Sequence, residues 1–362
     1  MDEKFIKKTF ILAKKGEGKT NTNPIVGAIL VKNNKIIGQG YHQKFGGNHA
    51  EVNAILDAEK NGNSVKNSTL YLNLEPCCNF GKTPPCTDKI ISSGIKKVVC
   101  ADIDPNPKVN GKGLKIMEKA GIEVKYGLLK NEANRFNEHY YWHIKNRRPF
   151  VALKIAQSLD GKIASASGDS KWITNEKSRK YVHKLRNKYD AILVGINTII
   201  IDNSHLGVRF VKGADPIRVI LDPHFRIPEN AAVLRDNKVI PVTLNPKNFS
   251  TKQKELYQKL LKQGIKFITF DEKIDLEILM SKLYELNIGS ILVEGGAYTF
   301  SSFLKAKLIN KIYTFIAPII IGNKNSKSAF DYLNNVKMTE TVKVKKNAYK
   351  KFDENILIIS YV

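Results

Sequence analysis

Strand-like and helix-like segments alternate along this 362-residue chain from end to end, and this alternation restricts the fold more than any other feature. Such a pattern produces sheets covered by helices, so we expect an α/β protein. One polar run that ends in a proline, at residues 145–149, interrupts the pattern and predicts a domain boundary. The chain length also suits two domains. We therefore expect one domain at residues 1–146 and another at residues 147–362.

The periodicity of apolar residues locates the individual elements. In the first half it predicts a helix at residues 4–15, a hairpin over 25–40 that turns at Asn33-Asn34, a helix at 50–60, a strand at 69–74, a short helix that ends near residue 94 and a strand at 97–103. In the second half it predicts strands at 150–157, 191–194, 217–221, 265–270, 290–293, 312–316 and 356–361. No internal repeat relates the halves, so we expect two different α/β folds.

Composition excludes several classes of protein. A hydrophobic content of 42% with 26% charged residues is typical of globular proteins, and no apolar stretch approaches the roughly 18 residues of a membrane span. The formal net charge is +25, but the lysines are scattered and lack interleaved aromatic residues, so we expect no nucleic-acid partner. Three of the four cysteines fall between Cys77 and Cys86, which favours a metal site in a reducing compartment over disulfides. We expect a cytoplasmic protein with no membrane partner.

Residues that can bind a metal stand at predicted element ends in the first half. His49 and Glu51 lie at or beside the first turn of the helix at 50–60, with Asn48 as its expected cap. Cys77 follows a proline at the end of a predicted strand, and Cys86 begins another predicted helix. Helix N-termini favour the thiolate form that zinc binds. We therefore predict His49, Cys77 and Cys86 as zinc ligands.

The predicted ligand set indicates a catalytic site. Three protein ligands leave the fourth tetrahedral position of zinc open to water. Zinc lowers the pKa of that water to about 7, and Glu51, which is no ligand, can move its proton to a leaving amine. The pattern is typical of zinc deaminases, although eight residues rather than two separate the cysteines. Ordinary packing is the alternative explanation for all these residues, and it is the one we favour for Cys78 and Cys100.

The second half lacks the glycine-rich dinucleotide fingerprint. Instead, the predicted strand at 290–293 runs into Glu294-Gly295-Gly296-Ala297 and then into an apolar helix. Glycines at such a turn bring main-chain N–H groups to a helix N-terminus, where a phosphate can bind. On its own the turn is also compatible with a purely structural role.

These motifs together resemble the bifunctional riboflavin biosynthesis proteins that join a pyrimidine deaminase to a reductase. The residues that carry the resemblance in the first half are Asn23–Gly27, Gly40–His42, His49–Glu51, Glu75–Cys77, Gly81–Cys86 and Asp104–Pro107. In the second half they are Lys154–Ala164, Ser170–Thr174, Leu185-Arg186, Ala191–Gly195, Leu206–Arg209 and Val293–Ala297. The resemblance implies a cytidine-deaminase-like α/β/α domain followed by a dihydrofolate-reductase-like α/β domain. The chain departs from the family at Cys78-Asn79, where Ser-His is common.

The resemblance also implies roles for individual residues. The pocket for the pyrimidine and ribose phosphate of the deaminase would be lined by Asn23, His42, Lys82, Asp104 and Asn106. The sugar phosphate substrate of the reductase would be faced by Lys154, Ser170, Arg186, Leu206, Arg209 and Glu294. NADPH would be faced by Ala156, Trp172, Thr198, Asp202, Gly295, Gly296 and Ala297. Arginine forks suit a phosphate, although surface ion pairing is an alternative for Arg186 and Arg209. Arg226 is a candidate for the 2′-phosphate of NADPH.

The implied enzyme carries out two steps of riboflavin synthesis on a phosphorylated pyrimidine. It removes the 2-amino group of 2,5-diamino-6-ribosylamino-4(3H)-pyrimidinone 5′-phosphate by zinc-dependent hydrolysis, then reduces the ribosyl group to ribityl with NADPH. We also expect a homo-oligomer, a dimer or tetramer. One alternative is a nucleoside or tRNA deaminase with an appended nucleic-acid-binding domain. Another is a non-catalytic, zinc-stabilised binding module, which would have no need of Glu51.

Overall fold

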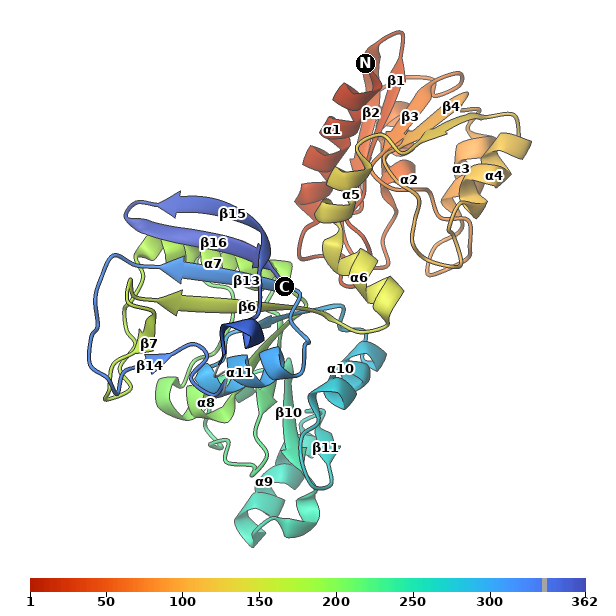
Figure 1. Ribbon diagram of the computed structural model, residues 1–362. Coiled ribbons are helices and arrows are strands. Elements are labelled where there is room, and N and C mark those ends of the chain that lie inside the picture. Colours follow the sequence, from red (N-terminus) through yellow and green to blue (C-terminus); the bar gives the residue numbers. More distant parts are fainter. Residues whose placement is uncertain (334–336) are drawn as a thin grey trace. The chain divides into compact units, whose positions relative to one another are not determined.

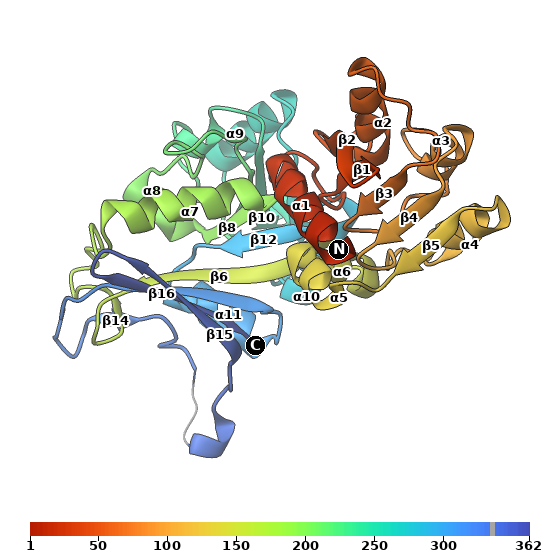
Figure 2. The ribbon, with the colours of Figure 1, turned by 90° about the horizontal axis from the view of Figure 1, so that it is seen from above.

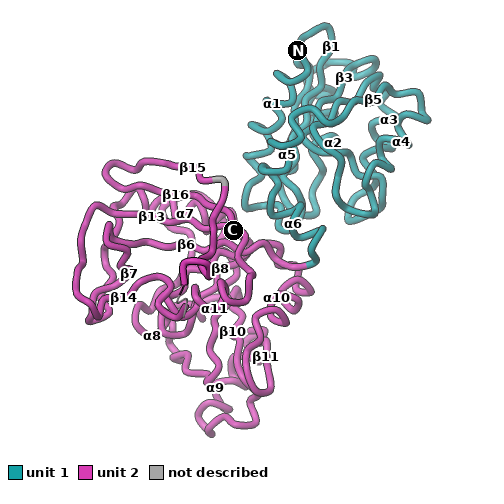
Figure 3. The backbone as a smooth tube through the Cα atoms, viewed as in Figure 1, with its two compact units in different colours: residues 1–147 teal, residues 148–362 magenta. Residues whose placement is uncertain are grey.

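The computed structural model describes residues 1–333 and 337–362. Its contacts divide the chain into two compact units, Met1–Arg147 and Arg148–Val362 (Figure 3). Each unit has its own sheet, helices and buried apolar clusters. The predicted α/β class is therefore confirmed for both units. None of the helices in the described residues combines the length and the apolar character that a membrane crossing requires.

The first unit is built on a five-stranded sheet with the order β2-β1-β3-β4-β5 (Figure 1). β1 pairs antiparallel with β2 and β3, whereas β3, β4 and β5 run parallel. The strands are β1 Gly27–Lys32, β2 Lys35–Tyr41, β3 Thr69–Leu72, β4 Lys97–Cys100 and β5 Glu123–Tyr126. The helices are α1 Asp2–Ala13, α2 Ala50–Lys60, α3 Cys86–Ser92, α4 Lys112–Lys119, α5 Lys130–Phe136 and α6 Glu138–Asn146.

Strand β1 shows why this sheet carries helices on both faces. Its Ala28 and Leu30 belong to an apolar cluster with α2, α3 and α4, while Ile29 and Val31 belong to a cluster with α1. Successive side chains of a strand point to opposite faces of a sheet. Both faces are therefore apolar and covered, and the unit has three layers, α/β/α.

The hairpin and the helix that follows it agree with the sequence prediction. Asn33 and Asn34 have φ of 51° and 60°, the left-handed values that a two-residue hairpin turn requires. Helix α2 begins at Ala50, as predicted, and lies close against β2. A Cβ on Gly40 would stand only 2.4 Å from the main-chain nitrogen of Ala54. This glycine therefore allows β2 to support the helix whose first turn carries the predicted catalytic glutamate.

Three strands are shorter than predicted. β3 ends at Leu72 instead of residue 74, β4 ends at Cys100 instead of 103, and β11 begins at Ile268 instead of 265. Beyond β3, side-chain hydrogen bonds take the place of the main-chain hydrogen bonds between strands. Asn73 accepts the main-chain N–H of Gly27 at 2.8 Å and donates to the main-chain oxygen of Ile25 at 3.0 Å. The segment that leads to the first cysteine is thus held without being a strand.

The second unit is built on a nine-stranded sheet with the order β11-β10-β9-β8-β12-β6-β13-β16-β15, and β7 and β14 form a separate pair. Neighbours from β11 to β13 are parallel, and β16 and β15 are antiparallel additions. The strands are β6 Phe150–Gln157, β7 Lys162–Ala164, β8 Ala191–Gly195, β9 Ile217–Leu221, β10 Val239–Leu244, β11 Ile268–Phe270, β12 Ser290–Val293, β13 Lys311–Ile316, β14 Lys327–Ser328, β15 Lys345–Phe352 and β16 Asn355–Tyr361. The helices are α7 Glu176–Lys188, α8 Ile196–Asp202, α9 Thr251–Lys262, α10 Leu276–Glu285 and α11 Ala297–Lys305.

Helices cover both faces of the larger sheet. Leu283 of α10 and Phe303 of α11 belong to a cluster with β6, whereas α8 and α9 share a cluster with Ile192 of β8. Figure 2 shows α7 and α8 on the side of the sheet opposite α11. Strands β12, β8 and β9 are adjacent and parallel, so their carboxyl ends meet at one edge. Ligands of open α/β sheets bind at this kind of edge.

Candidate active sites

Three candidate metal ligands converge in the first unit. His49 directly precedes α2, Cys86 is the first residue of α3, and Cys77 lies in the loop before α3. The Nδ1 atom of His49 is 3.4 Å from Cys77 Sγ and 3.3 Å from Cys86 Sγ. All three ligand atoms lie within 4.8 Å of one another. One imidazole and two thiolates in this arrangement fit a tetrahedral zinc site with one open position.

The surroundings of the two sulfur atoms favour a thiolate. Hydrogen bonds from Cys86 and His49 lower the pKa of Cys77, and the contact with Cys77 raises the pKa of Cys86. The main-chain N–H of Cys86 also donates to Cys77 Sγ at 3.4 Å. Zinc binds cysteine as thiolate, so the chemistry of the donor set fits this metal.

Glu51 lies beside the ligands without belonging to their cluster. It sits in the first turn of α2 and is only 3% exposed. Its Oε2 atom has no hydrogen-bond partner among the described residues. Burial raises the pKa of Glu51 to about 7. A carboxyl group with such a pKa can both accept and return a proton at neutral pH.

Three further residues of this unit test the sequence predictions. Asn48 does not cap α2: the N-cap residue is His49, which makes no capping bond because its imidazole faces the cysteines. Cys78 lies outside the ligand cluster, and its Sγ atom contacts the main-chain oxygen of Lys108 at 3.7 Å. Cys100 is buried in the apolar cluster beneath α2, in agreement with the packing role expected for it.

Two predicted pocket residues lie next to the ligands. Asn23 Nδ2 is 3.4 Å from His42 Nε2, and the rings of His42 and His49 are 5.1 Å apart. His42 Nδ1 is 3.1 Å from a main-chain oxygen of the loop before α2, so it donates there and leaves Nε2 as an acceptor. Burial lowers the pKa of His42, which favours this neutral form. Lys82, in the loop before α3, is exposed, and its Nζ stands 4.2 Å from the ring centre of Phe45 in the loop before α2.

The loop that carries Asp104 and Asn106 is held by a residue that the sequence did not single out. Asp104 Oδ1 accepts the main-chain N–H of Asn106 at 2.8 Å and the hydroxyl of Tyr140 at 2.7 Å. Burial raises the pKa of Asp104 to about 6. The carboxylate of Glu75 accepts two main-chain N–H groups of this loop and one from the first turn of α4, at 2.8–3.1 Å. Glu75 belonged to the resemblance motif, but its contact role is visible only in the tertiary structure.

A buried ion pair lies among the predicted reductase residues. Arg186 of α7 donates through Nε and Nη2 to the two carboxylate oxygens of Glu294, each at 2.8 Å. Lys154 of the neighbouring β6 interacts electrostatically with both, and burial lowers its pKa. Arg186 is 9% exposed, so the surface pairing considered from the sequence does not describe it. The structure brings these three predicted residues together from separate parts of the chain.

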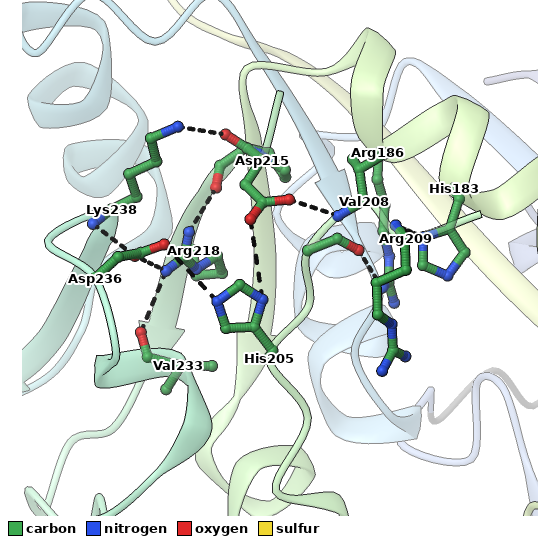
Figure 4. A network of polar contacts seen from close by, with 12 residues as sticks. His183, Arg186, His205, Val208, Arg209, Asp215, Arg218, Val233, Asp236 and Lys238 are labelled. Atoms are coloured by element: carbon green, nitrogen blue, oxygen red, sulfur yellow. Dashed lines mark hydrogen bonds and ion pairs between the residues drawn. The ribbon is translucent and has the colours of Figure 1, made fainter. Parts of the chain in front are cut away.

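The segment with Leu206 and Arg209 lies beside Arg186 (Figure 4). Arg186 Nη1 donates to the main-chain oxygen of Gly207 at 3.1 Å. The main-chain N–H of Arg209 donates to His183 Nδ1 at 3.0 Å, while the Arg209 side chain is exposed. Sequence reasoning missed His183, although it lies three residues before Arg186 and therefore on the same face of α7.

The predicted glycine turn has the expected geometry. β12 ends at Val293, and Gly296 directly precedes α11. A Cβ on Gly295 would stand 2.6 Å from the Cβ of Thr299, whereas a Cβ on Gly296 would meet no atom within 4 Å. Gly296 is therefore exposed and open directly before the N-terminus of a nine-residue helix. This backbone cradle fits a phosphate group of a dinucleotide such as NADPH.

Other predicted cofactor residues lie along the same strands. Ala156 follows Lys154 by two positions on β6 and so lies on the same face. Thr198 lies in α8, directly after β8. The neighbouring Asn197 accepts a hydrogen bond from Arg226 Nη2 at 2.9 Å. The 2′-phosphate candidate is thus adjacent to a predicted cofactor residue.

The remaining residues belong to exposed segments. Asp202 forms an ion pair with Lys171 at 2.7 Å, which ties the end of α8 to the segment with Ser170 and Trp172. Ser170 is exposed, and Trp172 is 69% exposed with the guanidinium of Arg179 4.5 Å from its ring centre. The Trp172 ring therefore lies at the surface, against Arg179.

A second group of potential metal ligands, His205, Asp215 and Asp236, lies in the second unit (Figure 4). Its carboxylates already have cationic or N–H partners. Asp236 pairs with the fully buried Arg218, and Asp215 accepts the main-chain N–H of Val208 at 2.6 Å. These contacts make the group an ion-pair network rather than a metal site.

Both units match known protein families. The RibD C-terminal domain matches residues 149–358, and the cytidine and deoxycytidylate deaminase zinc-binding region matches residues 1–102. The riboflavin biosynthesis protein RibD of Aquifex aeolicus is 43% identical over 99% of this chain and 98% of its own. The RibD protein of Escherichia coli is 34% identical over 89% of each chain.

A solved structure agrees over the same length. The diaminohydroxyphosphoribosylaminopyrimidine deaminase/5-amino-6-(5-phosphoribosylamino)uracil reductase of Thermotoga maritima superposes with a TM-score of 0.88 at 39% identity, covering 99% of this chain and 98% of that chain. The expected cytidine-deaminase-like and dihydrofolate-reductase-like folds are thereby confirmed. The alternative of a deaminase with a nucleic-acid-binding domain is not favoured, because the second half matches a reductase domain. The chain belongs to the RibD family of riboflavin biosynthesis proteins, bifunctional enzymes in which a zinc-dependent deaminase is followed by an NADPH-dependent reductase.

Proposed function

We propose that residues 1–146 deaminate 2,5-diamino-6-ribosylamino-4(3H)-pyrimidinone 5′-phosphate and that residues 147–362 reduce the ribosyl group of the product to ribityl. The activity for which the Thermotoga maritima protein is named supports this substrate. The observation that carries the deaminase assignment is the buried, unpaired Oε2 of Glu51 beside three convergent metal ligands. A structural zinc site has no need of such a carboxylate.

In the deaminase half, His49, Cys77 and Cys86 would hold the zinc. When bound there, zinc supplies Lewis acidity that lowers the pKa of a water molecule to about 7. Glu51 takes a proton from the attacking water and returns it to the departing amino group, which leaves as ammonia. Asn23 and His42, which contact each other at 3.4 Å, would orient the pyrimidine ring. Lys82, Asp104 and Asn106 contact the ribose phosphate side, and Glu75 keeps the loop of Asp104 and Asn106 in place.

In the reductase half, the glycine turn at residues 295–297 would hold a phosphate of NADPH, and Ala156, Trp172, Thr198 and Asp202 would complete the cofactor side. NADPH supplies the hydride when bound. Arg209 presents an exposed guanidinium to the substrate phosphate. Glu294, neutralised in part by Arg186 and Lys154, borders the sugar, and Ser170 and Leu206 complete this side. Arg226, held by Asn197, would contact the 2′-phosphate.

The proposal includes a cytoplasmic enzyme that assembles as a homo-oligomer, either a dimer or a tetramer. The composition and the cysteine usage support the location. Light scattering of the purified protein distinguishes the two assembly states from a monomer.

Ammonia release tests the proposed function directly. The full-length protein is supplied with zinc and with either the diaminopyrimidine ribosyl phosphate or an RNA that contains adenosine, and NADPH oxidation is followed in the same reactions. We expect ammonia and then NADPH oxidation from the pyrimidine alone. Ammonia from RNA, or no NADPH oxidation after deamination, would contradict the proposal.

A further inference from the structure

Three side chains from two parts of the second unit fix one short stretch of main chain beside the reductase site. Arg186 donates to the oxygen of Gly207, Asp215 accepts the N–H of Val208, and His183 accepts the N–H of Arg209. The distances between the bonded atoms are 3.1, 2.6 and 3.0 Å, respectively. Figure 4 shows these contacts following one another along the segment. Three consecutive residues outside any helix or strand are therefore each held by a side chain.

The conformation of this segment depends on those contacts. Leu206 has φ of 59°, a left-handed value that costs energy for a residue with a branched side chain. Gly207 lies so close to Asp215 that a Cβ there would stand 2.7 Å from Asp215 Oδ1 and 2.6 Å from His205 Nδ1. The local sequence alone does not favour such a path. Tertiary hydrogen bonds must therefore maintain it.

The His183 contact requires a neutral imidazole, because only an unprotonated ring nitrogen can accept a hydrogen bond. His183 is 5% exposed, and the ring of Phe210 lies 4.7 Å from its own. Burial and the positive charges of Arg186 and Arg209 lower the pKa of His183 to about 4. The ring is thus an acceptor at neutral pH. His205 contacts Asp215, the residue that holds Val208, because its ring lies between the carboxylates of Asp215 and Asp236.

We propose that His183 and Asp215 are positioning residues of the reductase site: they hold the main chain of Val208 and Arg209 so that the Arg209 guanidinium meets the substrate phosphate. The different roles of Arg209 and Arg186 follow from the exposure of their side chains. The side chain of Arg209 is exposed, whereas Arg186 is buried and committed to Glu294 and Gly207. A binding group must be held close to its productive geometry, and here the main chain supplies that rigidity. The inference rests on the proposed phosphate role of Arg209.

Substitutions at His183 can separate the hydrogen bond from packing. Asparagine places Oδ1 near the position of Nδ1 and keeps an acceptor, whereas leucine fills similar space without one. Asp215→Asn and Asp215→Ala form the equivalent pair for the other anchor. Each full-length variant is assayed with 5-amino-6-ribosylaminouracil 5′-phosphate and with the same compound lacking its phosphate. The dissociation constant of NADPH and the deaminase rate serve as controls.

We expect His183→Leu to raise KM for the phosphorylated substrate about tenfold. This is the effect of losing one charged hydrogen bond, here the one between the displaced Arg209 guanidinium and the phosphate. KM for the unphosphorylated substrate, NADPH binding and deamination should stay at wild-type values. His183→Asn should remain within about twofold of wild type in every measurement. Asp215→Ala should raise KM for the phosphorylated substrate in the same way, and Asp215→Asn should not. This second pair tests the proposal even if His183→Leu does not fold.

Arg209→Ala separates the positioning role of His183 from the phosphate-binding role of Arg209. In that background His183→Leu should have no further effect on KM, because both changes act on one interaction. Independent, multiplying effects would overturn the positioning role, as would an equal loss of both substrates in His183→Leu. Should Arg209→Ala itself leave the preference for the phosphorylated substrate intact, then the phosphate assignment of Arg209 is wrong, and the positioning proposal is overturned with it.

Discussion

The two halves of this enzyme build their sites in different ways. In the deaminase half, the ligands lie at or near the starts of α2 and α3, and each comes from a short motif. In the reductase half, an ion pair joins Arg186 and Glu294, which are 108 residues apart, and side chains of α7 hold a loop that follows α8. A metal site is concentrated in a few donors with specific chemistry. A phosphate and dinucleotide site depends more on where main chain and buried charges are held.

The largest expected effect tests how concentrated the deaminase site is. Cys77→Ser should remove zinc and abolish deamination, because a serine hydroxyl does not replace the thiolate as a zinc ligand. Cys78→Ser should keep both, since Cys78 lies outside the ligand cluster. Metal analysis of the two purified proteins checks this. Equal zinc loss in both variants would mean that the neighbouring thiol takes part in binding.

Glu51→Gln should retain zinc and the fold while slowing deamination by about 10²–10⁴-fold, the contribution of a general acid–base group. The amide cannot accept a proton from water. NADPH-dependent reduction of the deaminated substrate should persist at the wild-type rate, because the halves are separate units. Ammonia release and NADPH oxidation, measured in separate reactions, check both statements. Near-normal ammonia release would remove Glu51 from the mechanism.

Matched lysine substitutions at the two reductase arginines should separate a buried from an exposed role. Arg186→Lys loses the bidentate contact with Glu294, which should lower the free energy of unfolding by about 1–3 kcal/mol and raise KM for the phosphorylated substrate. Arg209→Lys should raise KM without a change in stability, because its side chain is exposed. NADPH binding should barely change in either variant.

Steady-state kinetics and urea unfolding of both proteins distinguish these outcomes. Weakened NADPH binding with intact substrate binding would move the arginines to the cofactor side. No change in either variant would indicate simple ion pairing, which at exposed sites contributes roughly 0–1 kcal/mol.

The smallest expected effect concerns pH and His183. Its pKa is lowered from the ordinary 6.5 to about 4 in the folded protein, so the unfolded chain binds a proton first as the pH falls. The stability that His183 contributes is therefore complete above pH 6.5 and decreases toward pH 4, by at most about 1.4 kcal/mol per pH unit. His183→Asn lacks this dependence. Urea unfolding of both proteins at pH 7.5 and 5.0 should show the difference between them shrinking at the lower pH. A constant difference would contradict the assignment of a neutral, buried imidazole.

Local chemistry made the first half readable from its sequence. The positive φ angles at Asn33 and Asn34 and the start of α2 at Ala50 follow from residue type and short spacing, and in the second half the same holds for the turn before α11. The sequence did not predict where β3 and β4 end. There, the side chains of Asn73 and Glu75 provide hydrogen bonds that a ladder would otherwise supply, and their partners are distant in sequence.

The sequence by itself determined the candidates for the zinc donors, for the proton-transfer carboxylate and for the phosphate-binding turn, because few residue types can perform these tasks and their motifs are short. Only the tertiary structure decided that Arg186 is buried against Glu294 and that Arg209 stays exposed. It alone revealed the hydrogen bonds that Glu75, His183 and Asp215 accept from main-chain N–H groups. The physical reason is that burial and long-range hydrogen bonding set the charge, the acceptor capacity and the reach of these side chains. Local spacing along the chain encodes neither the burial nor the long-range hydrogen bonds.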